Sequence, residues 1–496
     1  MNFLFVNNDW ISILPELFLV ICVNIILVYS VIYCTSSLFD FPLLVNNVSW
    51  LSIQILIIVF FLNINNYCCN VIIFNNSIII DSFGILIKSF VLVSAICILL
   101  MSLKYNRFEL INNFEFSILI MLTILGSLLL ISSYDLVTMY LAIELQSFCS
   151  YILSALKRNS EFSTEAGLKY FILGAFSSGF LLFGCSLIYG FTGATNYEQL
   201  ALLLVGVDHS YINNNGIIIG TVFIIISFLF KFSAAPFHLW APDIYEGSPT
   251  IVTAFFAIVP KIGLLVFFLR LFFDSLYTLF IPWQAILLIA SVSSMIVGSL
   301  GAIWQIKLKR LLAFSAIGHV GYMLIALCCC SIESIYALIF YSIIYIMMSI
   351  SSFSLLLMIR KNENLKKIKY IEDLTIVAKT NPFIGVCFAI TFFSIAGIPP
   401  LAGFFSKMFL FFSAISQSAY FLSIVGILTS VISCFYYLRI VQVAYFEQQS
   451  SWITLKKVDK EISVLISTIT LMLIIFFVHP NFLIIFIHNS ILDLCI

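Results

Sequence analysis

Lysines inside long apolar stretches are the feature of this chain that could do chemistry. Lys231, Lys261 and Lys407 each lie many residues from any polar loop. A charge near the centre of a bilayer costs about 2.5–3.5 kcal/mol on insertion scales, so such residues normally face a protein interior or a hydrated cavity. Snorkelling toward a helix end does not explain these positions. Because burial disfavours a charged amine and a nearby carboxylate favours it again, buried lysines are suited to loading and releasing protons.

Glu144, in the stretch YDLVTMYLAIELQSF, is the candidate carboxylate partner. We expect it to be the one carboxylate deep within a membrane span, acting on Lys169 or on Lys231. Lys169 stands at the start of its span, where snorkelling explains it in part. Lys88 and Arg439 also fall within spans, and for both either snorkelling or a structural role fits the sequence.

His238 and His319 are the candidate proton carriers between the lysines. Histidine titrates closest to neutral pH, so it can pass protons on without holding a permanent charge. A single histidine within a span is often only a hydrogen-bonded core residue. The company of Lys231 and Lys261 favours a functional role for His238, whereas for His319 both interpretations remain open.

Two proline-containing stretches predict broken helices. Pro236 has no amide hydrogen and should open the helix just beyond Lys231, and the stretch AGIPPLAGFFSKMFL holds Pro399 and Pro400. The breaks lie about 165 residues and five predicted spans apart, so the second falls in a unit that would repeat the first with inverted topology. Discontinuous helices at corresponding positions of inverted repeats indicate a transport path. Two unrelated proline kinks are the alternative.

The composition predicts an all-α integral membrane protein. Of the 496 residues, 62% are hydrophobic and 9% are charged, against roughly a quarter charged in an average soluble domain. Hydropathy predicts about 14 transmembrane helices, centred near residues 24, 55, 93, 124, 145, 179, 228, 261, 292, 319, 346, 397, 433 and 474. No separate soluble domain fits between these spans.

Basic residues fall mainly in alternate connections between the predicted spans. The odd-numbered connections, from 3 to 4 through 13 to 14, hold 16 of the 23 lysines and arginines, and the even-numbered ones hold essentially Arg270. This asymmetry predicts that the odd connections face the matrix or cytoplasm and that both termini face the opposite side. Asp243 and Glu246 are expected at the basic side, where they could simply cap the next helix.

Sequence signatures of metal or cofactor binding are missing. The 13 cysteines include no C-x-x-C pair, and no G-x-G-x-x-G or P-loop stretch occurs. We therefore expect no metal, haem or nucleotide site in this chain, whose own chemistry would be the movement of protons or cations.

Three stretches, taken together, resemble one known family. FKFSAAPFHLWAPDIYEGSPT with Pro260 and Lys261, KRLLAFSAIGHVGYM, and GIPPLAGFFSKMFLF look like the antiporter-like membrane subunits of proton-pumping NADH:ubiquinone oxidoreductase, respiratory complex I. The resemblance implies 14 helices with two inverted five-helix repeats and two discontinuous helices. It divides the chain into an N-terminal three-helix segment (1–110), a first repeat (111–275), a second repeat (276–450) and a C-terminal helix (451–496).

The resemblance also implies a set of proton-transfer residues on a hydrated axis in the middle of the membrane. It raises Lys169 to a member of this set and pairs the glutamate with a lysine, but it assigns nothing to Lys88 or Arg439. Carried over position by position, the set is Glu144, Lys169, Lys231, His238, Lys261, His319 and Lys407.

The activity that the resemblance implies is that of one subunit of a proton-translocating NADH:ubiquinone reductase, with no redox site in this chain. FMN, iron–sulfur clusters and ubiquinone would belong to partner subunits. The partners would be other membrane-arm subunits, including antiporter-like chains and small membrane chains, with lipids such as cardiolipin and no nucleic acid. A subunit of a multisubunit sodium/proton antiporter and a non-conducting structural subunit are the alternatives.

Residue choice bears on location. The bias toward residues with AT-rich codons, including 51 phenylalanines, and the wording PFHLWAPDIYEGSPT favour the mitochondrial inner membrane, with both termini on the intermembrane-space side. A bacterial plasma membrane is the second choice.

Overall fold

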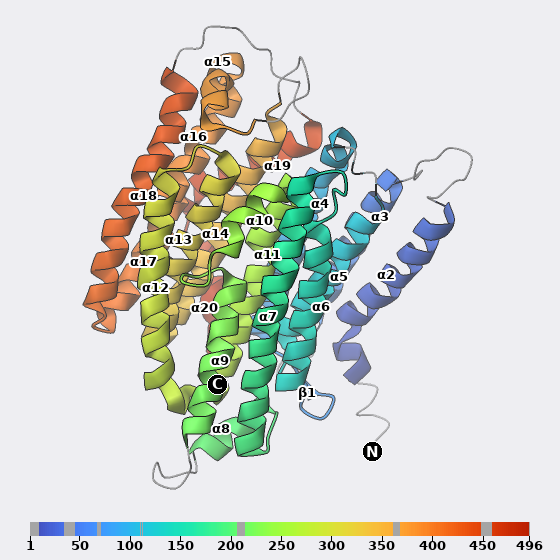
Figure 1. Cartoon of the computed structure of the whole chain (residues 1–496), viewed down its shortest axis with the longest axis vertical. Coiled ribbons are helices and arrows are strands. Elements are labelled where there is room, and N and C mark those ends of the chain that lie inside the picture. Colours follow the sequence, from blue (N-terminus) through green and yellow to red (C-terminus); the bar gives the residue numbers. More distant parts are fainter. Residues whose placement is uncertain are drawn as a thin grey trace.

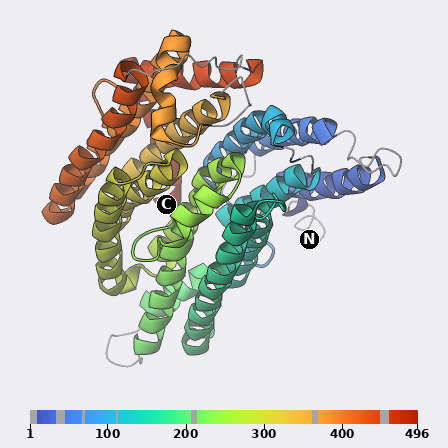
Figure 2. The same cartoon turned by 45° about the horizontal axis from the view of Figure 1, so that its top comes forward.

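The protein is a bundle of long helices standing side by side (Figure 1). The computed structural model describes residues 9–33, 45–66, 71–109, 111, 113–205, 214–360, 368–447 and 459–495. In Figure 1 helices α2 (Leu14–Tyr33) and α3 (Val45–Ile64) lie at one flank and α18 (Tyr420–Phe446) lies at the other. The turned view in Figure 2 keeps this order, with the middle of the chain between the two flanks.

The predicted spans agree with the observed helices. Among the described residues, 13 helices are long and apolar enough to cross a membrane, and each contains one predicted centre. The remaining centre, near residue 397, falls between two shorter apolar helices, α16 (Pro382–Ala396) and α17 (Ala402–Ser416). The all-α membrane fold is thus confirmed, whereas the two inverted repeats stay a prediction.

The first half of the chain contains a short hairpin and the helices up to the middle of the bundle. These elements are β1 (Val71–Ile73), β2 (Ile78–Ile80), α4 (Ser82–Phe108), α5 (Glu115–Ser132), α6 (Leu136–Ser154), α7 (Glu161–Thr192), α8 (Tyr197–Val205), α9 (Asn214–Phe232), α10 (Trp240–Gly247), α11 (Thr250–Phe268) and the π-helical segment η1 (Leu269–Ser275).

The second half continues with long helices and closes with a shorter one that the hydropathy pattern did not separate. These elements are η2 (Tyr277–Leu279), α12 (Phe280–Ile303), α13 (Leu308–Cys329), α14 (Ile332–Met358), η3 (Ile371–Ile376), α15 (Val377–Thr380), α16, α17, α18, α19 (Lys460–Val478) and α20 (Asn481–Cys495).

The first predicted break separates α9 from α10. Helix α9 ends at Phe232, one residue after Lys231, and Ser233 takes a left-handed conformation with φ of 63°. The chain then passes Pro236 before α10 begins. The indole of Trp240 donates a hydrogen bond of 2.8 Å to the carbonyl of Phe230, so the start of α10 satisfies a backbone group at the end of α9.

The second predicted break separates α16 from α17. Gly397 ends α16 with φ of 85°, a left-handed conformation that glycine adopts without steric cost. The two half-helices then touch, because a Cβ atom at Gly403 would lie 1.8 Å from the carbonyl oxygen of Ser394. The prediction of two discontinuous helices is confirmed.

Connections between helices gather at two ends of the bundle. The odd-numbered connections are joined by ion pairs of 3.2 Å from Lys157 and Arg360 to Glu109, and from Lys104 to Asp459. We call this the basic end. The even-numbered connections meet at the opposite end, where the hairpin, the start of α6 and the segment before α8 are hydrogen-bonded to one another.

Arg270 corrects one sequence-based expectation. It does not lie in a connection but in η1, directly continuous with α11, and only 2% of its side chain is exposed. Its guanidinium contacts the Asp81 carboxylate at 2.6 Å, and Asp81 also caps α4 through the amide of Gly84. A Cβ atom at Gly84 would meet both charged groups. Hydropathy failed here because a paired charge can be buried where an unpaired one cannot.

Lys88 is also paired rather than snorkelling. Its amine lies 2.6 Å from the carboxylate of Glu16, and both side chains are at most 6% exposed. Glu16 is a buried carboxylate that the sequence-based reasoning did not single out, and it lies in the first turn of α2, at the end of its span. Arg439, by contrast, is exposed on α18.

Breaking the Asp81–Arg270 pair should destabilise the attachment of α4 to η1. Arg270→Met leaves the buried Asp81 carboxylate unpaired, which costs about 3–5 kcal/mol. We expect less of the chain to survive heating of mildly solubilised membranes, measured by immunoblot of the remaining assembled particle.

The control is Arg439→Met, which removes an exposed arginine from a long helix and should leave survival unchanged. Adding Asp81→Leu to Arg270→Met should recover part of the loss, because the buried Asp81 carboxylate is no longer left unpaired, although its cap on α4 is lost as well. Equal survival of the Arg270→Met and Arg439→Met variants would contradict the structural role of the pair.

Candidate functional site

Glu144 and Lys231 meet inside the first half of the bundle. Glu144 projects from the middle of α6 and Lys231 from the last turn of α9. The Lys231 Nζ atom lies 3.9 Å from Glu144 Oε1, and the two side chains are only 11% and 12% exposed. Ser147 donates a long hydrogen bond of 3.4 Å to the other carboxylate oxygen. Of the two lysines that the sequence offered as partners for Glu144, the structure places Lys231 beside it.

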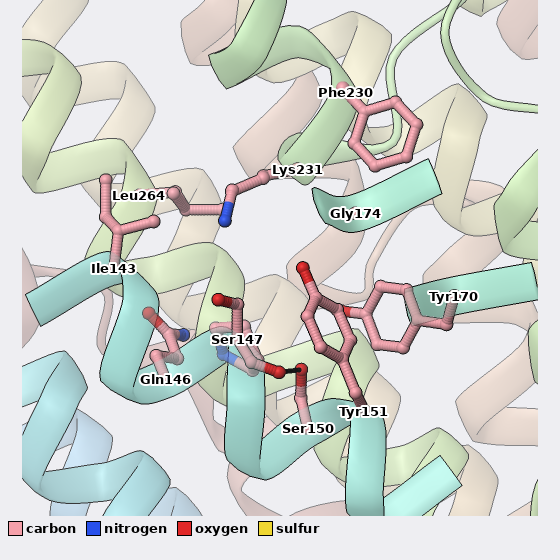
Figure 3. A pocket seen from close by; sticks show the side chains of 11 residues that line it. Ile143, Gln146, Ser147, Ser150, Tyr151, Tyr170, Gly174, Phe230, Lys231 and Leu264 are labelled. Atoms are coloured by element: carbon pink, nitrogen blue, oxygen red, sulfur yellow. Dashed lines mark hydrogen bonds between the residues drawn. The ribbon is translucent and has the colours of Figure 1, made fainter. Parts of the chain in front are cut away.

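A cavity adjoins this pair (Figure 3). Helices α6, α7, α9 and α11 surround it, and the Lys231 amine points toward Ser147 and Gln146 in the figure. The space open to the centre of a water molecule is about 30 Å³. Pro260 also lines the cavity, which brings α11 and its neighbouring residue Lys261 to the same region.

Lys261 lies at the centre of the bundle, on a helix that is buried on all sides. The residue is 3% exposed, and its amine lies 5.9 Å from the ring centroid of Tyr345 on α14. Within the described ranges its Nζ atom has no hydrogen-bond partner. The electron-rich face of the tyrosine ring is a weak compensation for a positive charge.

His319 on α13 is surrounded by tyrosine side chains. Its Nδ1 atom lies 2.6 Å from the hydroxyl of Tyr341, and its Nε2 atom lies 3.5 Å from that of Tyr437. The ring of Tyr345 lies 5.4 Å away and that of Tyr322 lies 6.2 Å away, centroid to centroid. Both ring nitrogens of His319 therefore face groups that can donate or accept a proton.

Lys407 on α17 is the last buried charged group of this interior set, in the second half of the chain. Its amine donates hydrogen bonds of 3.2 Å and 2.8 Å to the carbonyls of Ile395 and Ala396, the last residues of α16. The partial negative charge at a helix C-terminus favours a cation there. The amine also lies 5.5 Å from the ring centroid of Tyr322. The second helix break thus supplies the polar groups that hold Lys407.

Together these residues form a row through the interior. It has two parts: Glu144 with Lys231, and then Lys261, Tyr345, His319, Tyr322 and Lys407 in order of contact. The cavity that Lys231 lines is also lined by Pro260, the neighbour of Lys261, and so adjoins both parts. Two small cavities, of about 20 Å³ and 10 Å³ for the centre of a water molecule, are both lined by His319. A site of about 10–15 Å³ is enough for one water molecule, so the row has space for bridging water.

Two predicted site residues lie outside this row. Lys169 is 45% exposed and pairs with Glu165 at 2.7 Å and with Asp243 on α10 at 3.3 Å. His238 lies half-buried in the connection between α9 and α10, and its Nδ1 atom has no hydrogen-bond partner among the described residues. The roles of both residues in proton transfer stay predictions.

Asp243 and Glu246 hold α10 from two sides. Besides Lys169 on α7, Asp243 contacts Arg310 at the start of α13 at 3.6 Å, and Glu246 pairs with Arg310 and Lys307. Ion pairs exposed to solvent are worth little one by one, but several shared charges can act as a network. The structure thus shows these two carboxylates in ion pairs with basic residues of α7 and α13, and not as caps of the next helix, α11.

The tyrosines of the row are what the sequence-based reasoning missed. Tyr322 follows His319 by three residues and Tyr345 follows Tyr341 by four, so each pair shares one helix face. This spacing was the available signal, but buried tyrosines are common in membrane helices and their neighbours depend on helix packing. Among the described residues, no group of three or more His, Cys, Asp or Glu could hold a metal ion.

Curated proteins of similar sequence are named as subunits of NADH:quinone oxidoreductases. Residues 133–433 match the family described as NADH:quinone oxidoreductase/Mrp antiporter, TM. NADH-ubiquinone oxidoreductase chain 2 of Marchantia polymorpha is 47% identical, with 99% of this chain and 100% of the relative covered. The protein of the same name from Arabidopsis thaliana is 45% identical over 98% and 97% of the two chains. NADH-quinone oxidoreductase subunit N of Pelagibacter ubique is 40% identical over 95% and 96%.

Solved structures show the same fold. A chain of respiratory complex I from Thermus thermophilus superposes with a TM-score of 0.78 at 24% identity, covering 95% of this chain and 98% of that one. A chain of the Mrp complex from Dietzia superposes with a TM-score of 0.78 at 16% identity, covering 97% of each. The sequence relatives and the shared fold agree, and the chain therefore belongs to the NADH:quinone oxidoreductase/Mrp antiporter family of membrane subunits, in the group of NADH-ubiquinone oxidoreductase chain 2.

Proposed function

We propose that this chain is a proton-translocating subunit in the membrane arm of respiratory complex I. NADH oxidation and ubiquinone reduction take place in other subunits, which hold FMN, the iron–sulfur clusters and the quinone. One observation carries the proposal: the row from Glu144 to Lys407 places ionisable groups through the interior of an apolar bundle. Such groups are costly within a membrane and mark paths for ions or protons.

The Glu144–Lys231 pair is the loading step. At 3.9 Å the two groups attract each other, but they are beyond the range of a direct hydrogen bond. While the carboxylate lies close, it stabilises the ammonium. When the carboxylate moves away, the buried ammonium loses its compensating charge and releases its proton. A loosely held pair can make this change with a small displacement.

Lys261, His319 and Lys407 carry the proton onward. A neutral imidazole donates from one nitrogen and accepts at the other, and both His319 nitrogens face tyrosine hydroxyls. The proton leaving Lys261 therefore passes through His319 and its neighbouring tyrosines or bridging water. Lys407 receives it, since the carbonyls at the end of α16 stabilise its ammonium form.

Lys169 and His238 belong to the outer part of the proposed path. Lys169 contacts Asp243 near the basic end, and His238 stands in the break between α9 and α10. Both positions adjoin α10, the half-helix that lies between the loading pair and that end. They are suited to proton uptake rather than to transfer along the row.

The proposed setting is the mitochondrial inner membrane. The basic end faces the matrix because positively charged connections are retained on that side, and both termini face the intermembrane space. The partners are other complex I subunits, including further antiporter-like chains and small membrane chains. Lipids such as cardiolipin cover part of the exposed apolar faces of the outer helices.

Two alternatives differ in testable ways. A subunit of a separate sodium/proton antiporter would use the same fold, and the chain of the Mrp complex is similar in structure. The sequence relatives at 40–47% identity favour the redox-driven complex instead. A structural subunit would contain the same Glu144–Lys231 contact merely as a buried ion pair.

Replacing Glu144 and Lys231 together should separate conduction from structure. Lys231→Ala alone leaves Glu144 buried without its partner, at a cost of about 3–5 kcal/mol, so assembly should fall whatever the role of the pair. Glu144→Leu combined with Lys231→Met avoids the unpaired charge. We expect the double variant to assemble and to oxidise NADH but to pump fewer protons per NADH in sealed membrane vesicles.

The matched control is Glu16→Leu combined with Lys88→Met, which removes another buried ion pair that lies outside the row. It should leave the number of protons pumped per NADH unchanged. If the Glu144/Lys231 double variant also keeps that number, the pair is structural and the proposed path is wrong.

The redox coupling can be tested by native electrophoresis of mildly solubilised membranes. We expect an antibody against this chain to mark a large particle that also oxidises NADH in the gel. A small particle without NADH oxidation would instead identify a subunit of a separate antiporter.

A further inference from the structure

A further polar cavity lies at the basic end of the bundle, outside the row of ionisable groups. It is enclosed by the beginning of α3, the end of α4 and the beginning of α5, which lie side by side in Figure 1. The space open to the centre of a water molecule is about 10 Å³, enough for one group of the size of water. Its polar lining consists of Asn46, Ser49, Asn106, Arg107, Asn113 and Ser117.

Three buried oxygen atoms in this lining can accept hydrogen bonds from a ligand. Asn106 is 8% exposed, and its Oδ1 atom has no hydrogen-bond partner among the described residues. Ser49 and Ser117 are buried as well. Each donates its hydroxyl hydrogen to the carbonyl three residues earlier, at 2.8 Å and 3.0 Å, which leaves only oxygen lone pairs for a ligand. A cavity with this lining fits a small group that carries several hydrogen-bond donors.

Arg107 supplies the positive charge beside the cavity. Its side chain is exposed, and its Nε atom donates a hydrogen bond of 3.0 Å to Asn46 Oδ1. Lys104, one turn earlier on α4, pairs with two carboxylates, whereas Arg107 forms no ion pair with any described residue. The terminal nitrogens of its guanidinium are therefore available to an anion. A planar guanidinium binds phosphate through two parallel hydrogen bonds.

The position of the cavity matches the level of lipid headgroups. Three membrane-crossing helices begin or end around it. Trp50, four residues after Asn46 on α3, is 44% exposed, and tryptophan is enriched at the boundary between membrane and water. The N-termini of α3 and α5 carry partial positive charge, which favours a phosphate. Glu115 in the first turn of α5 is exposed and does not line the cavity.

We propose that this cavity binds the headgroup of phosphatidylethanolamine from the surrounding membrane. The ammonium group enters the cavity and donates hydrogen bonds to Asn106 Oδ1 and to the hydroxyl oxygens of Ser49 and Ser117. The phosphate binds the guanidinium of Arg107. A primary ammonium has three donors and no acceptor, which complements this lining. The site goes beyond the proposed function and does not depend on proton conduction.

Other common headgroups fit the cavity less well. The choline headgroup has no N–H donor, and its three methyl groups exceed a space of the size of one water molecule. The serine headgroup adds a carboxylate, which the buried oxygen atoms would repel. The glycerol headgroup offers hydroxyls, which carry one donor each and no positive charge. Recognition of the ammonium therefore predicts selectivity among phospholipids that share the same phosphate.

Cryo-electron microscopy of the assembled complex tests this selectivity directly. The purified complex is stripped of lipid with detergent and then equilibrated with phosphatidylethanolamine, phosphatidylcholine or phosphatidylglycerol. We expect headgroup density in the cavity, with phosphate beside Arg107, only with phosphatidylethanolamine. Equal density with either other lipid, or a cavity that holds only water with phosphatidylethanolamine, overturns the proposal. Density with free phosphoethanolamine, which has no acyl chains, identifies a soluble ligand and overturns the assignment to a lipid.

Arg107→Met and Asn106→Leu test the two halves of the site separately. We expect each to lower the affinity for phosphatidylethanolamine about ten- to a hundredfold, the effect of one lost hydrogen bond to a charged group. Affinity is measured by titrating the stripped complex in mixed micelles and quantifying the retained lipid by mass spectrometry. Asn106→Leu removes a buried acceptor and leaves no charge unpaired, so this variant remains informative if Arg107→Met fails to assemble.

Arg439→Met and Asn24→Leu are the matched controls. Arg439 is exposed on α18, and Asn24 is an exposed residue of α2 whose amide donates to a carbonyl of its own helix. Neither change should alter lipid retention. Unchanged retention in both Arg107→Met and Asn106→Leu overturns the site and leaves the proposed function standing. Unchanged pumping in the Glu144/Lys231 double variant overturns the proposed function and leaves the lipid site standing.

Discussion

Uncompensated charge in an apolar interior is the constraint on which this structure depends. Lys231, Lys261 and Lys407 all lie among helices that cross a membrane, and each is compensated in a different way. A carboxylate lies beside the first, an aromatic ring beside the second, and two backbone carbonyls bind the third. None of these arrangements neutralises the charge as fully as a short ion pair would. The lysines are therefore kept in a state from which a proton can leave.

The structure separates charges that hold helices together from charges that can exchange protons. The Glu16–Lys88 and Asp81–Arg270 pairs are both 2.6 Å long and buried, so each is a direct, charge-assisted hydrogen bond. The Glu144–Lys231 pair is 3.9 Å apart. A tight pair stabilises one charge state and one position, which suits an anchor. A loose pair can change its charge state when one helix shifts slightly, which suits a carrier.

The two helix breaks help to compensate the buried charges because they bring backbone dipoles to the depth of the lysines. At the second break the carbonyls that end α16 bind Lys407, and Gly403 lets the two half-helices touch. At the first break Trp240 binds the freed end of α9 and packs against Tyr170. Non-helical backbone is tolerated at membrane depth only where protein or water satisfies it. At each break a side chain donates hydrogen bonds to backbone carbonyls of the half-helix that ends there.

The sequence by itself determined the spans, the two breaks, the alternation of basic connections and three of the buried lysines, Lys231, Lys261 and Lys407, but not the burial of Lys88 or the exposure of Lys169. These features follow from local physics: apolar length, the missing amide of proline, and the cost of charge in lipid. It did not determine the partners of the charges. These partners depend on how separate helices pack. Helix packing decides whether Glu144 meets Lys169 or Lys231 and whether Arg270 is buried against Asp81. It also decides which tyrosines surround His319. The local sequence around a charged residue is the same whichever helix packs against it. Only the tertiary structure therefore decided which charges meet.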